Sequence, residues 1–476
     1  MQASIKFLLP FMLLALSVNA FGQCSPIADP DCVPSIGATG FSGLPIDQLP
    51  PGARSLGLGG AFVGVADDAT AAIANPGGLT ILTAKEFSVH MRNSDSDIDF
   101  FDPDAFDSTN RGAGTGRMNK LYSDSGTDVS FASFVMPFDR WVFSAYYANQ
   151  LNFSSNQVGG PDVVKDNTFI DTFHNDNSID ASLDGYGVSA AFRLTDSFSI
   201  GVTLSQTKLD MVSLDNWQVD HFNDLELDLA LLSPEFTKEQ YESAILDEFL
   251  IQSAIDESDS DTTFSVGLLY SLNSQWSFGL VYKQGAEFDV TTNTTGTFNF
   301  NCLGDGGAAA NCRDLLAGIS LPINSTSSYG STPATIKIPD TLSFGVGWRP
   351  SDLWLISFDI NQIGYGDLTQ IRDITQGLGL DVNSAGQLTE EIKDATTFHI
   401  GVEKVFVLES NNTISIRGGA FTVEDHDGIK NIDSNDTAFT VGLGTTFGSM
   451  GQFQLDLGAS FADSTNNIIL SGIYRF

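Results

Sequence analysis

Basic side chains are scarce in this sequence. Only 22 Lys and Arg stand against 59 Asp and Glu, which gives a formal net charge of −37 over 476 residues. A protein that follows the phosphates of a nucleic acid needs a basic face, so nucleic-acid binding is excluded as a function class. A disordered acidic chain is excluded as well, because 36 Phe and 46 Gly residues accompany the acidic ones.

Long apolar runs are missing too. No segment reaches 18 consecutive apolar residues, which excludes membrane-spanning helices. Residues 1–20 have the features of a secretory signal peptide: Lys6 is positive, the 12 residues 7–18 are apolar, and Val18-Asn19-Ala20 is a small-residue cleavage site. The mature chain is therefore expected to be either soluble beyond the inner membrane or inserted in the outer membrane as strands.

Cysteine is rare, with four residues in two distant pairs, Cys24 with Cys32 and Cys302 with Cys312. Three connectivities are possible, and local pairing within each pair is the least demanding of them. We therefore predict the disulfides Cys24–Cys32 and Cys302–Cys312, each pinning a short loop. No His lies close to either pair, so no metal site is predicted there, and Gln23 is a poor residue to precede a lipidated Cys24.

Motifs that carry catalytic chemistry are absent. The five His residues are scattered, and no nucleophile-elbow motif accompanies them, so we expect neither an enzyme nor a cofactor. Six Asp residues crowd the segment 95–107, where Ca²⁺ binding is one interpretation. They lack the turn Gly and distal Glu of an EF-hand loop, so a solvated acidic loop is favoured.

What the sequence does contain is a two-residue rhythm. In Thr341–Arg349, Leu342, Phe344, Val346 and Trp348 fall on one face, while small or polar residues fall on the other. Such alternation predicts strands with one apolar and one polar face. A soluble β-sandwich is one solution; fourteen strands, an even number, favour a closed membrane barrel. The predicted strands are 86–92, 127–138, 140–153, 183–194, 197–210, 262–272, 275–291, 340–349, 352–365, 395–406, 411–423, 436–447, 451–462 and 467–476.

The connections between these strands mostly alternate between short turns and long loops. Short periplasmic turns opposite long extracellular loops are typical of outer-membrane barrels, and both chain ends then lie on the periplasmic side. Four of the five Trp lie beside a short turn, at the height of the periplasmic aromatic girdle: Trp141, Trp276, Trp348 and Trp354. A final alternating strand that ends in Phe476 resembles the signal that the barrel-assembly machinery reads. We therefore predict a chain in the outer membrane, surrounded by its lipid, and expect a monomer.

The segment 21–85 does not alternate and is rich in Gly, Ala and Pro. Within it, the run Gly57–Gly64, the residues 66–69 (Ala-Asp-Asp-Ala) and the Asn75-Pro76 step closely resemble the N-terminal region of the FadL-type outer-membrane transporters of long-chain fatty acids and other hydrophobic compounds (OMPP1/FadL/TodX). The resemblance implies an N-terminal hatch inside a fourteen-stranded barrel, residues 86–476. Gly77 replaces the Ala that usually follows Asn-Pro, and we expect the tight turn to survive. A plug without a gating role is the alternative.

The resemblance also implies a capture groove, formed by the predicted outer loops 211–261 and 292–339. Apolar residues in 211–261 at helical spacing predict amphipathic helices, although they could equally form the loop's own small core. The groove candidates are Leu229, Leu231, Leu232, Phe236 and Phe249.

Two lumen-facing cations lie in the middle of predicted strands, Lys283 and Arg417. Either is a candidate partner for a ligand carboxylate, and ion pairs with lumen acids such as Glu403 and Asp456 are the alternative. The implied function is passive uptake of a long-chain fatty acid or another hydrophobic molecule, through groove capture, a lumen pocket and hatch gating. A PorV-like barrel, a secretion or scaffold component with a similar Gly-rich N-terminus, is the alternative function.

Overall fold

The computed structural model describes most of the chain. The described residues are 49–99, 121–166, 169–223, 245–301, 325–364, 394–409, 412–424, 435–448, 452–462 and 465–476. The signal peptide 1–20, all four cysteines, and Leu229, Leu231, Leu232 and Phe236 lie outside them. Phe249 lies within a described strand, although its side chain does not belong to the described part.

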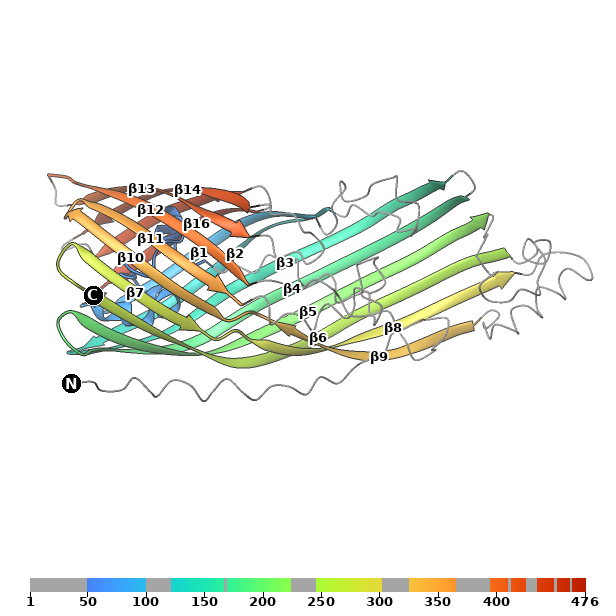
Figure 1. Ribbon diagram of the computed structural model, residues 1–476, viewed down its shortest axis with the longest axis horizontal. Helices are drawn as coiled ribbons and strands as arrows, with labels where there is room; N and C mark the ends of the chain where they lie inside the picture. The colour runs from blue at the N-terminus through green and yellow to red at the C-terminus, as the bar shows by residue number, and fades with distance from the viewer. Residues whose placement is uncertain are drawn as a thin grey trace, which may run out of the picture.

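The described strands form one closed antiparallel barrel (Figure 1). Consecutive strands pair along the ring, and the last strand returns to the first, with Glu86 opposite Arg475. The strands are β1 (Glu86–Asp99), β2 (Leu121–Phe138), β3 (Trp141–Asp166), β4 (Phe169–Arg193), β5 (Phe198–Asn223), β6 (Ile245–Ser271), β7 (Trp276–Lys283), β8 (Glu287–Asn301), β9 (Ser325–Lys337), β10 (Thr341–Ser351), β11 (Trp354–Ile363), β12 (Ala395–Val407), β13 (Thr413–Glu424), β14 (Asn435–Phe447), β15 (Phe453–Phe461) and β16 (Thr465–Arg475).

Two wall strands are interrupted. β7 and β8 are two parts of one strand, separated by residues 284–286, and β10 and β9 are two parts of the next, separated by 338–340. We call the end of the barrel near Phe476 the lower end, so β7 and β10 are the lower parts and β8 and β9 the upper parts (Figure 1). Counted in this way, the sixteen described segments make a ring of fourteen strands. The predicted number of strands and their order along the chain are confirmed.

The two faces of each strand differ as the alternation predicts. Leu342 and Phe344 on β10 are 49% and 43% exposed, whereas Ser343 between them is buried. The four Trp beside short turns are also exposed on the outside of the barrel, and the rings of Trp276 and Trp348 stack at 5.5 Å. This outer surface is the band that faces lipid.

At the end opposite Phe476, β3 to β6, β8 and β9 run far beyond the other strands (Figure 1). There the two faces exchange character. On β5, Val202 and Leu204 point outward in the lower part, but Lys208 points outward in the upper part while Leu209 and Met211 are buried inside. Outside the bilayer the surroundings are water, so the apolar side chains turn inward.

These extensions correct the predicted outer loops. Much of 154–182, 211–261 and 292–339 is strand, and the helix predicted around Ile245–Leu250 is part of β6. The prediction was wrong because the alternation persists with its faces exchanged, which obscures it in the sequence. Among the described residues, no helix has the length and apolar character needed to cross a bilayer.

The N-terminal residues 49–85, which we call the inner segment, lie inside the ring (Figure 1). They contain two short helices, α1 (Ala53–Gly57) and α2 (Ala71–Ala74), and a 3₁₀ helix, η2 (Pro76–Ile81). α1 contacts β13 to β16, and η2 contacts β3 to β6 on the other side of the lumen. The inner segment therefore crosses the lumen from wall to wall.

Candidate functional site: the inner segment and the surrounding wall

Glycines on the lumen face allow the wall to approach the inner segment closely. At seven positions around the ring, a Cβ atom would collide with the backbone of the inner segment or with Asn75 and Pro76. Only a residue without a side chain permits this approach. The seven wall glycines are Gly201, Gly267, Gly279, Gly345, Gly401, Gly419 and Gly458. Sequence reasoning missed them, although glycine at lumen-facing positions of the alternation was an available signal.

The Asn75-Pro76-Gly77 step is a buried connector. The Asn75 side chain accepts a hydrogen bond from Gly77 N at 3.1 Å and donates to Val63 O at 2.9 Å and Leu268 O on β6 at 3.0 Å. One amide thus joins two parts of the inner segment to the wall. A Cβ at position 77 would lie 2.9 Å from Gly267 O. Gly77, in place of the usual Ala, therefore fits this wall.

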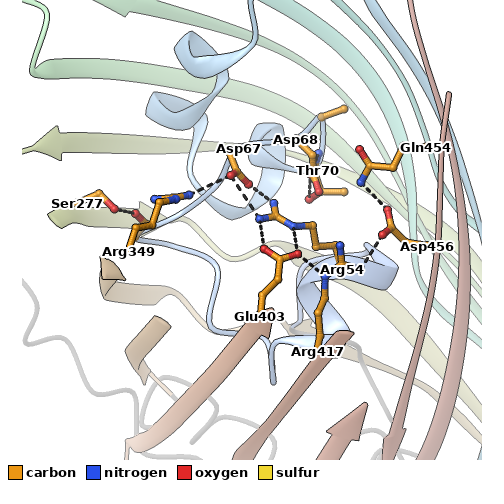
Figure 2. A network of polar contacts seen from close by, with 12 residues as sticks. Arg54, Asp67, Asp68, Thr70, Ser277, Arg349, Glu403, Arg417, Gln454 and Asp456 are labelled. Carbon is orange, nitrogen blue, oxygen red and sulfur yellow. Dashed lines mark hydrogen bonds and ion pairs between the residues drawn. The ribbon is translucent and has the colours of Figure 1, made fainter. Parts of the chain in front are cut away.

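A buried ion-pair network joins the inner segment to the strands β10, β12, β13 and β15 (Figure 2). Arg54 pairs with Asp67 and, through two hydrogen bonds of 3.0 and 3.2 Å, with Glu403. Arg417 pairs with Glu403 at 2.7 Å and with Asp456 at 2.6 Å. Glu403 thereby bridges the two guanidinium groups, and each of them has one further carboxylate partner.

The network keeps the Arg54 side chain of the inner segment charged although it lies inside the barrel. Burial alone would lower the pKa of the Arg54 guanidinium, but the negative charges of Asp67 and Glu403 outweigh it and hold that pKa well above the ordinary value. Arg349 on β10 adds a further ion pair to Asp67 at 3.1 Å. Buried charges of this kind are tolerated because each is paired and hydrogen-bonded.

Further polar bonds hold the backbone of the inner segment around most of the ring. The Asp359 carboxylate accepts hydrogen bonds from Phe62 N and Val63 N at 2.6 and 2.7 Å. Other wall side chains that bond the backbone of the inner segment are Glu86, Arg193, Thr203, Ser277, His399, Thr440 and Ser471. These residues come from β1, β4, β5, β7, β12, β14 and β16.

The wall differs at β2 and β3. Phe131, Val135, Val142 and Ala148 meet the inner segment through apolar contacts, in a cluster that includes Ala72. In the described part of these strands, the ladder between β2 and β3 ends at the pair Phe131–Ala148, although both strands continue. In this sector of the wall, the four side chains meet the inner segment without polar bonds. The ladder between the two strands is also incomplete there.

Beyond the inner segment, on the side of the strand extensions, lies a second buried apolar cluster. We call it the upper apolar cluster. Its members come from β3 to β6, from β8 and β9, and from residue 286 before β8. They are Leu151, Phe153, Ile179, Ala181, Leu183, Leu209, Met211, Ile255, Ala286, Phe288, Val290 and Ile336. The cluster was not predicted from the sequence, because five of its twelve members lie in segments taken for loops: Ile179, Ala181, Met211, Ile255 and Ile336.

The two candidate cations lie in different surroundings. Arg417 is 5% exposed and bonded to Glu403 and Asp456, the acid partners that formed the alternative in the sequence analysis. Lys283 lies at the upper end of β7, level with Thr341 on β10. In the described part of the chain, no group of three or more His, Cys, Asp or Glu side chains is arranged to hold a metal ion.

The sequence model of one protein family, outer membrane protein transport protein (OMPP1/FadL/TodX), matches residues 52–470. The chain belongs to this family. Its members are transport proteins of the outer membrane, and the closed fourteen-stranded ring described above agrees with that location. The resemblance of the inner segment is thereby confirmed at the level of the family. None of the curated proteins matches the sequence.

Solved structures show the same fold as this FadL-type chain. A FadL homologue from Pseudomonas aeruginosa is 15% identical, with a TM-score of 0.57 over 89% of this chain and 98% of its own. The toluene transporter TbuX of Ralstonia pickettii is 15% identical, with a TM-score of 0.53 over 91% and 99%. The toluene transporter TodX of Pseudomonas putida is 14% identical, with a TM-score of 0.50 over 91% and 100%.

Proposed function

We propose that this FadL-type barrel takes up long-chain fatty acids or other hydrophobic molecules passively, and that the inner segment is a hatch that yields on its β2–β3 side. The observation that carries this proposal is the uneven attachment of the inner segment. Ion pairs and hydrogen bonds join it directly to β10, β11, β12, β14 and β16, whereas Phe131, Val135, Val142 and Ala148 share only an apolar cluster with it.

The energetic difference between the two sides supports a directed opening. Breaking a buried ion pair such as Arg54–Glu403 leaves an uncompensated charge and costs about 3–5 kcal/mol. An apolar contact can instead be exchanged for contact with an apolar ligand at little cost, because the same side chains stay out of water. A hydrophobic ligand is thus suited to replace the inner segment at Phe131 and Ala148, but not at Glu403.

The end of the β2–β3 ladder gives the released molecule a direction. Above Phe131 and Ala148 the two strands are not joined by ladder pairs in the described residues, and only farther along does Ser154 N donate to Asp124 at 3.1 Å, so the wall is weakened beside the apolar contacts of the hatch. A lateral exit there would deliver the molecule into the lipid rather than into water. We place the exit of the transport path in this sector.

The upper apolar cluster is the proposed lumen pocket, since its members are apolar side chains turned away from water. Leu229, Leu231, Leu232, Phe236 and Phe249 remain the proposed capture groove. Lys283 remains the proposed partner for a carboxylate. Two of the similar structures are named toluene transporters and one is named a FadL homologue, so fatty acids and aromatic hydrocarbons are both candidate substrates.

The decisive experiment measures uptake of labelled oleate and labelled toluene by cells with and without the protein. We expect faster uptake of at least one compound when the protein is present. A matched control is the variant Phe344→Arg, whose outward side chain should impair membrane assembly without touching the lumen. Equal uptake of both compounds with and without the assembled protein would refute the proposed function.

A further inference from the structure

The wall contains a second interruption, far from β2 and β3. Residues 284–286 separate β7 from β8, and residues 338–340 separate β10 from β9 at the same height. Ile338 N donates to Ala286 O at 2.8 Å, and a Cβ on Gly285 would collide with Ile338 O. Two neighbouring wall strands are therefore broken together, at a point where the backbones lie too close for a side chain.

Beside this break, the ladder between β6 and the adjacent strand stops and later resumes. Below the break the last pair is Ser265 with Lys283, and above it pairing begins again at Ala254 with Asn293. The intervening residues 255–263 of β6 have no ladder partners on that side in the described chain, and at the lower edge Phe264 O still accepts a hydrogen bond from Gln284 N at 3.0 Å. At about 3.3 Å per residue, the interruption extends roughly 30 Å along the strand.

Carboxylates occupy the place of the missing ladder. Asp261 accepts a hydrogen bond from Glu287 N at 3.0 Å, and Asp259 accepts one from Asp289 N at 2.8 Å. At the base of the break, Asp340 accepts from Gly285 N at 2.7 Å. A side-chain acceptor can rotate away and leave its donor to water, which a backbone carbonyl in a ladder cannot do without moving the strand.

The interruption connects two different environments. On its inner side, Ile255, Phe288 and Val290 belong to the upper apolar cluster. On its outer side, directly below it, the exposed rings of Phe264 and Tyr282 lie 5.9 Å apart, as in the aromatic belt at a membrane surface. The interruption therefore begins at the outer surface of the membrane and leads to a buried apolar interior.

We propose that the interruption between β6 and β8 is a side window, through which a hydrophobic molecule gathered at the outer surface of the membrane enters the upper apolar cluster. Asp259 and Asp261 act as its latch: their side chains close the wall when the window is empty and rotate away when a molecule passes. This entrance is distinct from the β2–β3 exit, and the identity of the molecule that it admits rests on the proposed function.

Hydrogen exchange on the unmodified protein, resolved to single amides, tests the window without any transport. The amides of Glu287 and Asp289 should exchange at least about tenfold faster than the ladder-bonded amides of β7, because side-chain bonds open locally. The neighbouring amides of β6 that bond to β5 provide an internal control, since that ladder is continuous across the same height. Equal protection of Glu287, Asp289 and β7 would overturn the proposal.

A reversible tether tests the role in uptake. The pair Ser260→Cys and Glu287→Cys, whose side chains are both exposed on the outer face of the wall, would close the window with a disulfide, in a parent whose four native cysteines are replaced by Ser. The matched control is Gln206→Cys with Thr262→Cys, which lies at the same height on the intact β5–β6 ladder.

Oxidation should lower the rate of uptake of labelled oleate or toluene in the window pair, because it closes one of two entrances. Reduction should restore the rate, and the control pair should not respond. Full uptake with the window locked would overturn the proposal while leaving the proposed function intact. If the unmodified protein takes up neither compound, the proposed function fails, and the exchange experiment alone decides whether the window opens. The exchange result also stands if the Ser-substituted parent does not fold.

Discussion

Replacing Glu403 by Gln removes the charge that joins two guanidinium groups. Glu403 is 5% exposed, and it accepts hydrogen bonds from Arg54 at 3.0 and 3.2 Å and from Arg417 at 2.7 Å. Gln has nearly the same size as Glu, but it is neutral and therefore provides no negative charge to Arg54 or Arg417. Removing one partner of a buried ion pair costs about 3–5 kcal/mol. Asp67 and Asp456 still accompany the two Arg residues, so we expect the lower half of that range.

The cost falls on docking of the inner segment, since Glu403 stands on the wall and Arg54 on the inner segment. At about 1.4 kcal/mol per factor of ten, a loss of about 3 kcal/mol raises the undocked population roughly a hundredfold. The assay is ionic conductance of the purified barrel in planar bilayers, which should show new open events. Lys208→Gln is the control, because its ion pair with Asp210 is exposed and lies outside the lumen.

Two results would refute this reasoning. The first is a Glu403→Gln protein that assembles normally and conducts no more than the parent. The second is increased conductance of equal size in Lys208→Gln, which would show that any loss of charge has this effect. A barrel that fails to assemble is recognised on gels by loss of the heat-modifiable band. Arg349→Gln then replaces the first variant, because it removes only the outermost ion pair, to Asp67.

The remaining predictions concern the wall. Gly345→Val should displace the inner segment at a cost of about 1–3 kcal/mol or more, because a Cβ there meets Gly64 N, and limited proteolysis should then cleave the inner segment. The control Gly418→Val should leave it protected, because a Cβ there meets only Thr440 O, at 3.8 Å. Leu342→Arg should impair assembly by about 2–4 kcal/mol, seen as a weaker heat-modifiable band; an unchanged band would contradict its outward facing. Deletion of Phe476, whose N–H donates to Lys85 O at 3.0 Å, should slow membrane insertion in a pulse-chase experiment, and a normal rate would remove the argument for a terminal signal.

The barrel itself could be predicted because its signal is local. Each strand carries its own alternation, so the segment Thr341–Arg349 indicates a strand without reference to any distant residue. The number of strands and the positions of the four Trp beside short turns follow from repeating that reasoning along the chain. The outer extensions of the strands were not predicted, because their apolar and polar faces are exchanged at the membrane surface. The residues around Leu209 therefore do not continue the alternation of the membrane part of β5.

What the sequence by itself determined is thus a lipid-facing barrel with a Gly-rich segment before it, since period, small residues and turn lengths are properties of short stretches. Only the tertiary structure decided which groups meet. Glu403 and Arg54 are 349 positions apart, and Asp359 reaches Phe62 across 297, so no local pattern could pair them. The interruptions at Phe131–Ala148 and between β6 and β8 are likewise relations between strands. Closing the ring brings those strands together, and the packing of the inner segment against the wall then determines where it is held and where it can yield.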